Sequence, residues 1–212
     1  MKIDRAGWPF ILSALFLCLA LWLTVGPAGG VPLAVLAVLF LFFFRDPARH
    51  SPSTTGVVVS PADGRVLIAG AMEPGVAPPG EWQQVSIFLS PLDVHVNRIP
   101  AGGRITRVDY RPGRALPAYK RQAADVNERS EVWIDHHGQT LVARQVVGIL
   151  ARRVVCRVKP GDEVYTGERF GVMKFGSRMD VFLPMDAAVL VRVGDTVRGG
   201  ETPIAALCGG GA

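Results

Sequence analysis

The feature that most constrains this chain is a long uncharged stretch that runs from Ala6 to Phe44. Its first part, Ala6–Val25, is long enough to cross the core of a lipid bilayer as a helix. The segment Gly26–Gly30 contains a proline and three glycines, which interrupt a helical pattern. The second part, Val31–Phe44, is shorter than the first and is short for a full crossing. This pattern predicts a helical hairpin in or on a membrane.

The residues that flank the apolar stretch are basic on both sides. Lys2 and Arg5 precede it, and Arg45 and Arg49 follow it. Because basic flanks favour the cytoplasm, we expect both ends of the hairpin there, with the protein held at the cell membrane. A cleaved signal peptide is the alternative, but the hydrophobicity resumes after the break and no small-residue cleavage site follows. Residues 1–45 are therefore interpreted as a membrane anchor.

The composition changes sharply after Asp46-Pro47. Proline and glycine punctuate short runs rich in valine and isoleucine, a pattern typical of an antiparallel β domain. The runs are Val57–Val59, Arg65–Ile68, Val85–Leu89, Val132–Ile134, Leu141-Val142, Val146–Leu150 and Val154–Val158. Residues 46–212 are therefore predicted to form one mainly β (α+β) domain.

An internal repeat supports this expectation. The segments 158–168 and 191–201 align without gaps, and both follow the pattern V-x-x-G-D-x-V-x-x-G-E. Such strand-turn-strand units resemble the half-motifs of lipoyl and biotinyl barrels. Ser60–Val66 has the style of a further strand and turn. We therefore expect a duplicated, lipoyl/biotinyl-like β sandwich or barrel.

Several functional classes lack support in the composition. The three cysteines are far apart, which indicates neither a disulfide framework nor a metal site, and no nucleotide-binding glycine loop occurs. The net charge is +5, and a basic stretch runs from Arg104 to Arg121. No nucleic-acid motif accompanies it, so we expect no nucleic-acid partner. Beside an anchor, attraction to anionic lipid headgroups is the simpler interpretation, and a plain solvated loop is an equal alternative.

The pair Gly176-Ser177, in a segment predicted to form a β-hairpin, offers a chemical hypothesis. Glycine leaves its carbonyl sterically open, and a serine hydroxyl just after that carbonyl can attack it if a base takes the proton. The resulting ester could lose the upstream chain by β-elimination. Hydration and loss of ammonia would convert Ser177 into a pyruvoyl group. On these residues alone, a hairpin with a surface serine is the simpler interpretation.

The candidate base is His95. Strand alternation predicts that Asp93, His95 and Asn97 share one face, which either lines a cleft or faces water. Asp63 lies in a predicted tight turn and could orient the imidazole; alone, it is an ordinary Asp-Gly turn.

Lys174 supports a rival function. Biotin carriers present a lysine beside methionine on a hairpin between two such half-motifs, and Met173-Lys174 occupies that place. Phe175 follows where a methionine is typical, which weighs against a carrier. A membrane-anchored adaptor with a lipoyl-like domain is a third alternative.

Five motifs occur in an order that carries a resemblance. They are Phe43–Pro47, Ser60–Gly64, Leu89–Arg98, Asn127–Arg129 and Lys174–Ser177. Together they resemble the short form of the phosphatidylserine decarboxylase proenzymes, over about 43–204.

The resemblance implies self-cleavage into a β chain, 1–176, and an α chain, 177–212, that remain together. It implies a covalent pyruvoyl cofactor on Ser177, which takes the substrate amine as a Schiff base and accepts electrons as carbon dioxide leaves. It also implies phosphatidylserine as the substrate and an Asp–His–Ser set for cleavage, which carries over to Asp63 and Ser177. A higher oligomer stays open.

One departure from the family pattern concerns Arg98. Longer members have D-x-H-x-x-H-x-P, in which the second histidine is assigned to self-cleavage and the first to work near the pyruvoyl group. Here the first histidine is His95, and Arg98 occupies the second position. We therefore expect His95 to serve both steps; the alternative is that another group is the base for self-cleavage.

Overall fold

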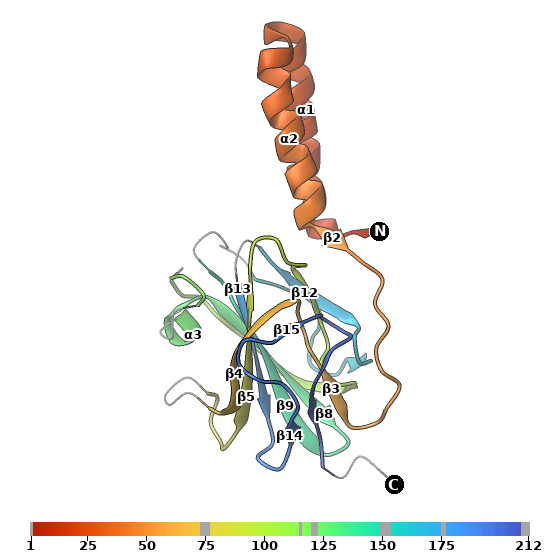
Figure 1. The fold of residues 1–212 in the computed structure, drawn as a ribbon, viewed down its shortest axis with the longest axis vertical. Coiled ribbons are helices and arrows are strands. Elements are labelled where there is room, and N and C mark those ends of the chain that lie inside the picture. The colour runs from red at the N-terminus through yellow and green to blue at the C-terminus, as the bar shows by residue number, and fades with distance from the viewer. Residues whose placement is uncertain are drawn as a thin grey trace. The chain divides into compact units, whose positions relative to one another are not determined.

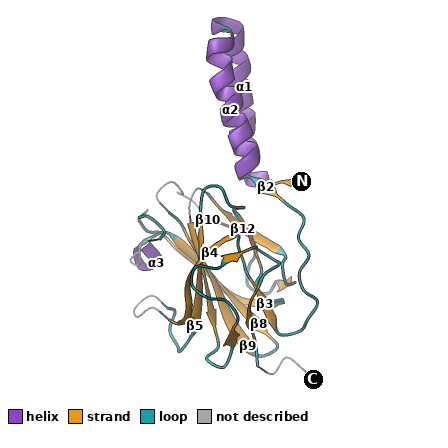
Figure 2. Cartoon of the chain, in the orientation of Figure 1, coloured by secondary structure: helices purple, strands orange, loops and turns teal. Residues whose placement is uncertain are grey.

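The computed structural model describes residues 2–72, 77–114, 116–119, 123–148, 154–174 and 177–208. The chain divides into two compact units, Met1–Ala48 and Arg49–Ala212. Each is described by itself (Figures 1 and 2).

The first unit is a hairpin of two apolar helices. Gly26, with φ of 85°, separates α1 from α2 and lets the chain reverse. A two-residue ladder pairs Lys2 with Asp46 and Ile3 with Arg45 at the base. The elements are β1 (Lys2–Ile3), η1 (Arg5–Gly7), α1 (Trp8–Val25), α2 (Pro27–Phe43) and β2 (Arg45–Asp46).

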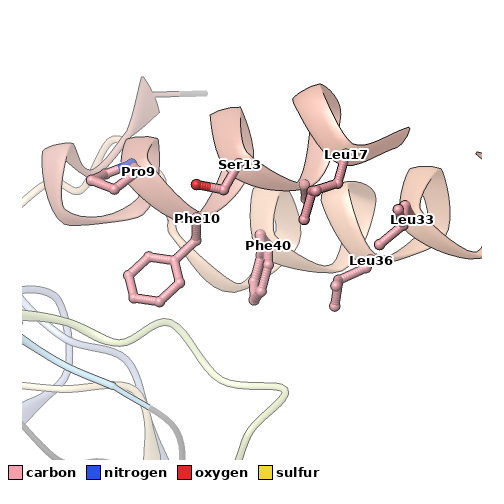
Figure 3. A pocket seen from close by; sticks show the side chains of 8 residues that line it. Pro9, Phe10, Ser13, Leu17, Leu33, Leu36 and Phe40 are labelled. Carbon is pink, nitrogen blue, oxygen red and sulfur yellow. The ribbon is translucent and has the colours of Figure 1, made fainter. Parts of the chain in front are cut away.

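The surface of this hairpin is apolar. Large side chains such as Phe16, Leu23 and Val38 are more than 60% exposed. A pocket of about 300 Å³ opens between the two helices, and Ser13 is the one polar side chain among its eight lining residues (Figure 3). The segment Arg5–Val25 is long and apolar enough to cross a membrane, whereas α2 is shorter. Since exposed leucine and phenylalanine are costly in water, this surface suits lipid chains.

The second unit is built from antiparallel sheets. The largest has eight strands in the order β11-β7-β8-β9-β13-β5-β4-β15, and two three-stranded sheets have the orders β10-β12-β6 and β14-β16-β3. The strands are β3 (Val57–Val59), β4 (Gly64–Ala71), β5 (Gln83–Leu89), β6 (Val96–Arg98), β7 (Gly103–Arg111), β8 (Arg129–His136), β9 (Gln139–Val146), β10 (Val154–Cys156), β11 (Glu163–Val164), β12 (Arg169–Met173), β13 (Ser177–Leu183), β14 (Ala188–Val189), β15 (Thr196–Val197) and β16 (Pro203–Ala206). A short helix, α3 (Ala123–Val126), precedes β8.

Two hydrophobic cores lie between the large sheet and the smaller ones. Val85 and Ile87 of β5 pack in one core with Ile204 of β16. Ile105 of β7 and Ile134 of β8 pack in the other with side chains of β12. All five named side chains are fully buried, and burial of a side chain of this size contributes about 1.5–3 kcal/mol. Each small sheet thus covers a different half of the large one.

The two copies of the repeated motif adopt the same turn. Asp162 accepts a hydrogen bond from the Lys159 N–H at 2.9 Å, and Asp195 accepts one from the Arg192 N–H at 2.8 Å. The glycine of each turn, Gly161 in the first copy and Gly194 in the second, has φ of 95° and 97° respectively. The first copy leads into β11, which pairs with β7, and the second leads into β15, which pairs with β4. The two turns therefore occupy opposite edges of the large sheet.

The sequence predicted the broad class correctly, since the chain is mainly β with antiparallel sheets and an N-terminal apolar helix. The predicted hairpin around Gly176-Ser177 is wrong. Strand β12 pairs with β10 and β6, whereas β13 pairs with β5 and β9. The connection therefore passes from one sheet to another, which local sequence periodicity cannot distinguish from a hairpin.

Candidate active site

Ser177 is the first residue of the central strand β13. It pairs in register with Leu89, the last residue of β5, and its side chain is fully buried. Its Oγ has no hydrogen-bond partner among the described residues. Buried hydroxyls are normally paired, because an unpaired one loses its bonds to water without replacement. Gly176 lies outside the described residues.

His95 ends the connection from β5 to β6 and is 1% exposed. Its Nδ1 lies 2.9 Å from the Asp93 carbonyl oxygen. A carbonyl only accepts, so Nδ1 carries the hydrogen and Nε2 is the basic nitrogen of the neutral ring. The His95 carbonyl accepts a hydrogen bond from the Met173 N–H at 3.2 Å, four residues before Ser177. Of the three residues predicted to share a polar strand face, His95 and Asn97 are buried, whereas Asp93 is half-buried. Asp93 and His95 precede β6.

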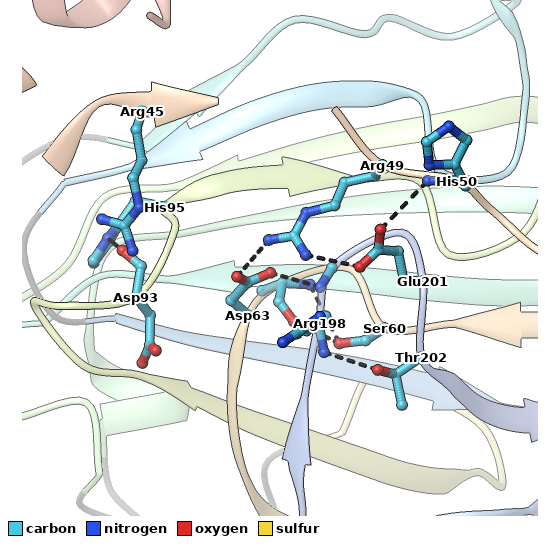
Figure 4. Close-up of polar contacts among 12 residues, drawn as sticks. Arg45, Arg49, His50, Ser60, Asp63, Asp93, His95, Arg198, Glu201 and Thr202 are labelled. Carbon is cyan, nitrogen blue, oxygen red and sulfur yellow. Dashed lines mark hydrogen bonds and ion pairs between the residues drawn. The ribbon is translucent and has the colours of Figure 1, made fainter. Parts of the chain in front are cut away.

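Asp63 lies in the turn between β3 and β4. Its Oδ2 is 2.6 Å from the Arg49 guanidinium, and its Oδ1 accepts the Gly199 N–H at 2.7 Å. Arg49 also binds Glu201 at 2.9 Å, as Figure 4 shows. The contacts described for Asp63 are thus with Arg49 and Gly199, and the predicted orientation of His95 by Asp63 stays a prediction.

Two opposing influences act on the pKa of Asp63. Burial raises the pKa of the Asp63 carboxyl above its usual value, and the Gly199 N–H and the Arg49 guanidinium partly offset this by favouring the carboxylate. The negative charge of Asp93 raises the same pKa slightly, so Asp93 lies within electrostatic reach. The hydrogen bond from Arg49 lowers the pKa of Glu201. The Gly199 N–H and the Arg49 guanidinium therefore both favour the ionised form of Asp63 against the effect of burial.

The end of β5 brings the candidate residues together. Phe88 pairs with Arg65 in β4, and the next residue, Leu89, pairs with Ser177. Gly64 lies so close to β5 that a Cβ there would come within 2.1 Å of the Phe88 carbonyl oxygen. The Asp63 turn and Ser177 therefore flank the same strand end, from which the chain continues to His95.

Arg98, which stands at the position of the second histidine in longer members, is buried. It is 6% exposed, and its Nη1 donates to the Gly167 carbonyl oxygen at 3.0 Å. Its backbone N–H donates to the Pro61 carbonyl, two residues before Asp63. The described contacts of Arg98 thus join β6 to the Asp63 turn and to the turn after β11.

A buried charged group fixes the strand that begins at Ser177. Arg178 is 1% exposed, and its Nε donates to Asp180 at 2.6 Å while its Nη2 donates to Ser86 of β5 at 3.0 Å. Ser86 also donates to Asp180. Loss of one partner from a buried pair is strongly destabilising, by about 3–5 kcal/mol. This cluster therefore holds β13 against β5 beside Ser177.

The arrangement suits proton transfer and nucleophilic chemistry in a site shielded from water. It offers a buried hydroxyl, an imidazole with a fixed tautomer and a carboxylate held by an arginine. The described residues hold no group of three or more His, Cys, Asp or Glu side chains that could bind a metal. A covalent group formed from Ser177 fits the buried position, because the strand keeps it in place.

Sequence analysis did not identify Arg49 as part of the site, because it appeared only as a basic flank of the apolar stretch. Its side chain is 9% exposed. Nor did the sequence indicate that Asn97 pairs with Gln145 at 2.8 Å, a contact that joins β6 to β9. The only sequence signal for Arg49 was its place beside Arg45 after the apolar stretch, and a charged residue type alone does not indicate that the side chain is buried.

The chain matches known proteins over most of its length. The family model "Phosphatidylserine decarboxylase" matches residues 36–205. A protein of Symbiobacterium thermophilum named phosphatidylserine decarboxylase proenzyme is 45% identical, over 97% of this chain and 95% of that protein. Proteins of the same name from Pelodictyon phaeoclathratiforme and Nitrosomonas europaea are 41% and 39% identical, over 94% and 96% of this chain and 97% and 94% of their own lengths.

Proposed function

The chain belongs to the phosphatidylserine decarboxylase family, and we propose that its self-cleavage falls between Gly176 and Ser177. It is a carboxy-lyase, made as a proenzyme, that converts phosphatidylserine into phosphatidylethanolamine with a pyruvoyl group formed from a serine. One observation carries the proposed position: the buried Oγ of Ser177 has no hydrogen-bond partner among the described residues, at the start of a central strand.

In the proposed maturation, Ser177 Oγ attacks the Gly176 carbonyl and the peptide becomes an ester. His95 takes the hydroxyl proton on Nε2, because Nδ1 already carries a hydrogen directed at the Asp93 carbonyl. Elimination then leaves Gly176 with a free carboxylate and residue 177 as dehydroalanine. Addition of water and release of ammonia convert residue 177 into the pyruvoyl group.

The proposed decarboxylation uses the same buried surroundings. The pyruvoyl group supplies an electron sink that holds the substrate amine covalently while carbon dioxide departs. His95 then gives a proton to the substrate carbon that has lost its carboxylate, since imidazole both accepts and donates protons near neutral pH. Burial of the serine position and of His95 limits water at this carbon.

We assign Asp63 an electrostatic role in cleavage. As a carboxylate it favours a positive charge on a nearby imidazole, the charge that His95 acquires when it takes the Ser177 proton. Arg49 and the Gly199 N–H hold this carboxylate in place. Asp63 and Arg49 are therefore proposed as positioning residues and His95 as the catalytic base.

The two proposed chains, 1–176 and 177–212, share every described sheet of the β unit except β10-β12-β6. Strand β13 lies between β5 and β9, β15 lies on β4, and β16 lies on β3. Cleavage of one peptide bond leaves all these ladders intact. The mature enzyme is therefore proposed to be an αβ pair that separates only on unfolding.

The helical hairpin is proposed as the membrane anchor, with the β unit on the cytoplasmic side. Its exposed leucine, valine and phenylalanine side chains and the basic residues at its two ends support this. A chain truncated to begin at Asp46 should leave the membrane fraction and still cleave itself, because no proposed catalytic residue precedes Asp46. Fractionation and a denaturing gel measure both. A folded truncated chain that no longer cleaves would contradict the assignment.

The β unit is proposed to be a duplicated fold of the lipoyl/biotinyl type. The two matching turns at opposite edges of the large sheet, each next to one core, support this proposal. The carrier function that Lys174 suggested does not follow, because Lys174 directly follows β12, and β12 and β13 belong to different sheets instead of forming a hairpin.

The intact mass of the purified protein tests the cleavage site. We expect two chains, 1–176 and 177–212, and a pyruvoyl mass on the smaller chain that resists Edman sequencing. Ser177→Ala should remain one inactive chain. Gln139→Ala, a change at the first residue of the neighbouring strand β9, serves as the matched control and should still cleave. An active, uncleaved wild-type chain would overturn the proposal, and biotin on Lys174 would appear on an avidin blot.

A further inference from the structure

A second pocket lies in the β unit, apart from the catalytic residues. It measures about 370 Å³ and is bordered by residues 52–57, the β7 start, the turn between β8 and β9, and residues 163–166. Its ionisable side chains are those of His136, His137, Glu163 and Tyr165.

The sequence around this pocket matches the sequence around the catalytic site. Ser51-Pro52 begins a segment that ends in Gly56-Val57, and Ser90-Pro91 begins a segment of the same length that ends in His95-Val96. Further on, Pro61-Ala62-Asp63-Gly64-Arg65 aligns with Pro100-Ala101-Gly102-Gly103-Arg104. The two segments bond reciprocally, because Val59 N–H donates to Pro100 and Arg98 N–H donates to Pro61, each at 2.8 Å.

The strand geometry matches as well. Gly64 has φ of 152° and a Cβ there would lie 2.1 Å from the Phe88 carbonyl oxygen. Gly103 has φ of 156° and a Cβ there would lie 2.1 Å from the Asp135 carbonyl oxygen. The large sheet has β5 next to β4 and β13 on one side, and β8 next to β7 and β9 on the other. The pocket therefore stands where the second half of the sheet repeats the catalytic site.

The reactive side chains are not repeated. Gly102 stands in place of Asp63, and Gly56 stands in place of His95. Strand β9 is the counterpart of β13 in the second half of the sheet. It begins at Gln139, whereas β13 begins at Ser177. With neither the nucleophile nor the base, the second pocket lacks the groups that the cleavage and the decarboxylation require. What it retains is a hollow with polar groups, which suits binding.

His136 indicates what the pocket binds. It is 9% exposed, and its Nδ1 bonds to the Gly102 carbonyl oxygen. Since that carbonyl only accepts, Nδ1 carries the hydrogen and Nε2 presents a lone pair. Nε2 is buried and has no hydrogen-bond partner among the described residues. A ligand that donates a hydrogen bond would satisfy this acceptor.

Glu163 adds a negative charge to the same lining. It is exposed at the start of β11, and Arg104, its cross-strand partner, does not line the pocket. An acceptor nitrogen and a carboxylate that line the same pocket suit a donor that carries positive charge. We propose that this pocket is a non-catalytic site for a primary ammonium group, such as free ethanolamine or the headgroup of phosphatidylethanolamine. Glu163 disfavours the additional carboxylate of a serine headgroup, so an ethanolamine group binds more tightly than serine.

The test uses the full-length Ser177→Ala protein in nanodiscs of phosphatidylcholine, which removes turnover. Ring nitrogens of the ¹⁵N-labelled histidines are followed by NMR during titration with ethanolamine, serine or choline. We expect a saturable change at His136 Nε2 with ethanolamine, binding at least about tenfold weaker with serine, and none with choline, which has no N–H to donate. Equal responses to ethanolamine and choline, or no saturable response to ethanolamine, would overturn the proposal.

Two variants and one lipid exchange complete the design. Glu163→Gln alters an exposed side chain and should weaken ethanolamine binding about tenfold, while His136→Phe should abolish it. Unchanged affinity in a folded Glu163→Gln protein contradicts the proposed ligand. Nanodiscs that contain phosphatidylethanolamine distinguish the source: a His136 change without added amine identifies the lipid headgroup, and a change with free ethanolamine alone identifies the soluble amine.

Discussion

The regions around Ser177 and around His136 have the same backbone arrangement and different side chains. Both have a strand-turn-strand unit at the sheet edge and a glycine pressed against a neighbouring carbonyl. Only the first has a serine, an imidazole and a carboxylate at the corresponding positions. The comparison separates the backbone features of the fold, which both regions have, from the side chains proposed for the reaction, which only the region around Ser177 has.

The largest expected difference between the regions concerns His95. His95→Ala should slow cleavage by about a hundredfold to ten-thousandfold, because loss of a general base typically costs this much. His50→Ala, a change at an exposed histidine, should cleave normally. The cleaved fraction is followed over time on a denaturing gel, and formation of the ethanolamine lipid is assayed separately. Normal cleavage without decarboxylation in His95→Ala would confine His95 to the second step.

A smaller loss of stability, equal in both regions, is expected when Gly64 or Gly103 is replaced, since each lies close to a backbone carbonyl oxygen. Gly64→Ala and Gly103→Ala should each lower the free energy of unfolding by about 3 kcal/mol, because each new Cβ meets a backbone carbonyl. Gly194→Ala, where φ is also positive but the space is open, should cost only about 1 kcal/mol. Denaturant unfolding measures all three in the uncleaved Ser177→Ala background. If only Gly64→Ala were costly, the two regions would not share one structural requirement.

The smallest expected effect is a change in pH dependence at the catalytic region. Arg49→Met removes the guanidinium that lowers the pKa of Asp63, while burial, which raises it, remains. The Asp63 pKa should therefore rise, and cleavage should begin to fail at a higher pH on acidification. Cleavage rates across pH 4–8, with His50→Ala as the control, measure this limb. An unchanged limb in Arg49→Met would show that ionised Asp63 is not needed.

The sequence predicted the broad fold because its signals are local. An uncharged stretch and valine-rich runs between glycines identify helices and strands without knowledge of their partners. For the site, ordered motifs in the sequence name Asp63, His95 and Ser177 as candidates, and their roles stay predictions. The exchange of sheets between β12 and β13 was not predicted, because strand pairing is a long-range property. Arg49 was missed for the same reason: its partners Asp63 and Glu201 are distant in sequence.

The contacts of Asp63 also determine when during biosynthesis the site becomes complete. Gly199 and Glu201, which hold Asp63 directly and through Arg49, lie near the C-terminal end of the chain, well after Ser177. A ribosome makes these residues only after Ser177, the proposed site of cleavage. Under the proposed mechanism, an unfinished chain carries the bond between Gly176 and Ser177 before Gly199 and Glu201 exist, and cleavage waits until both have been made.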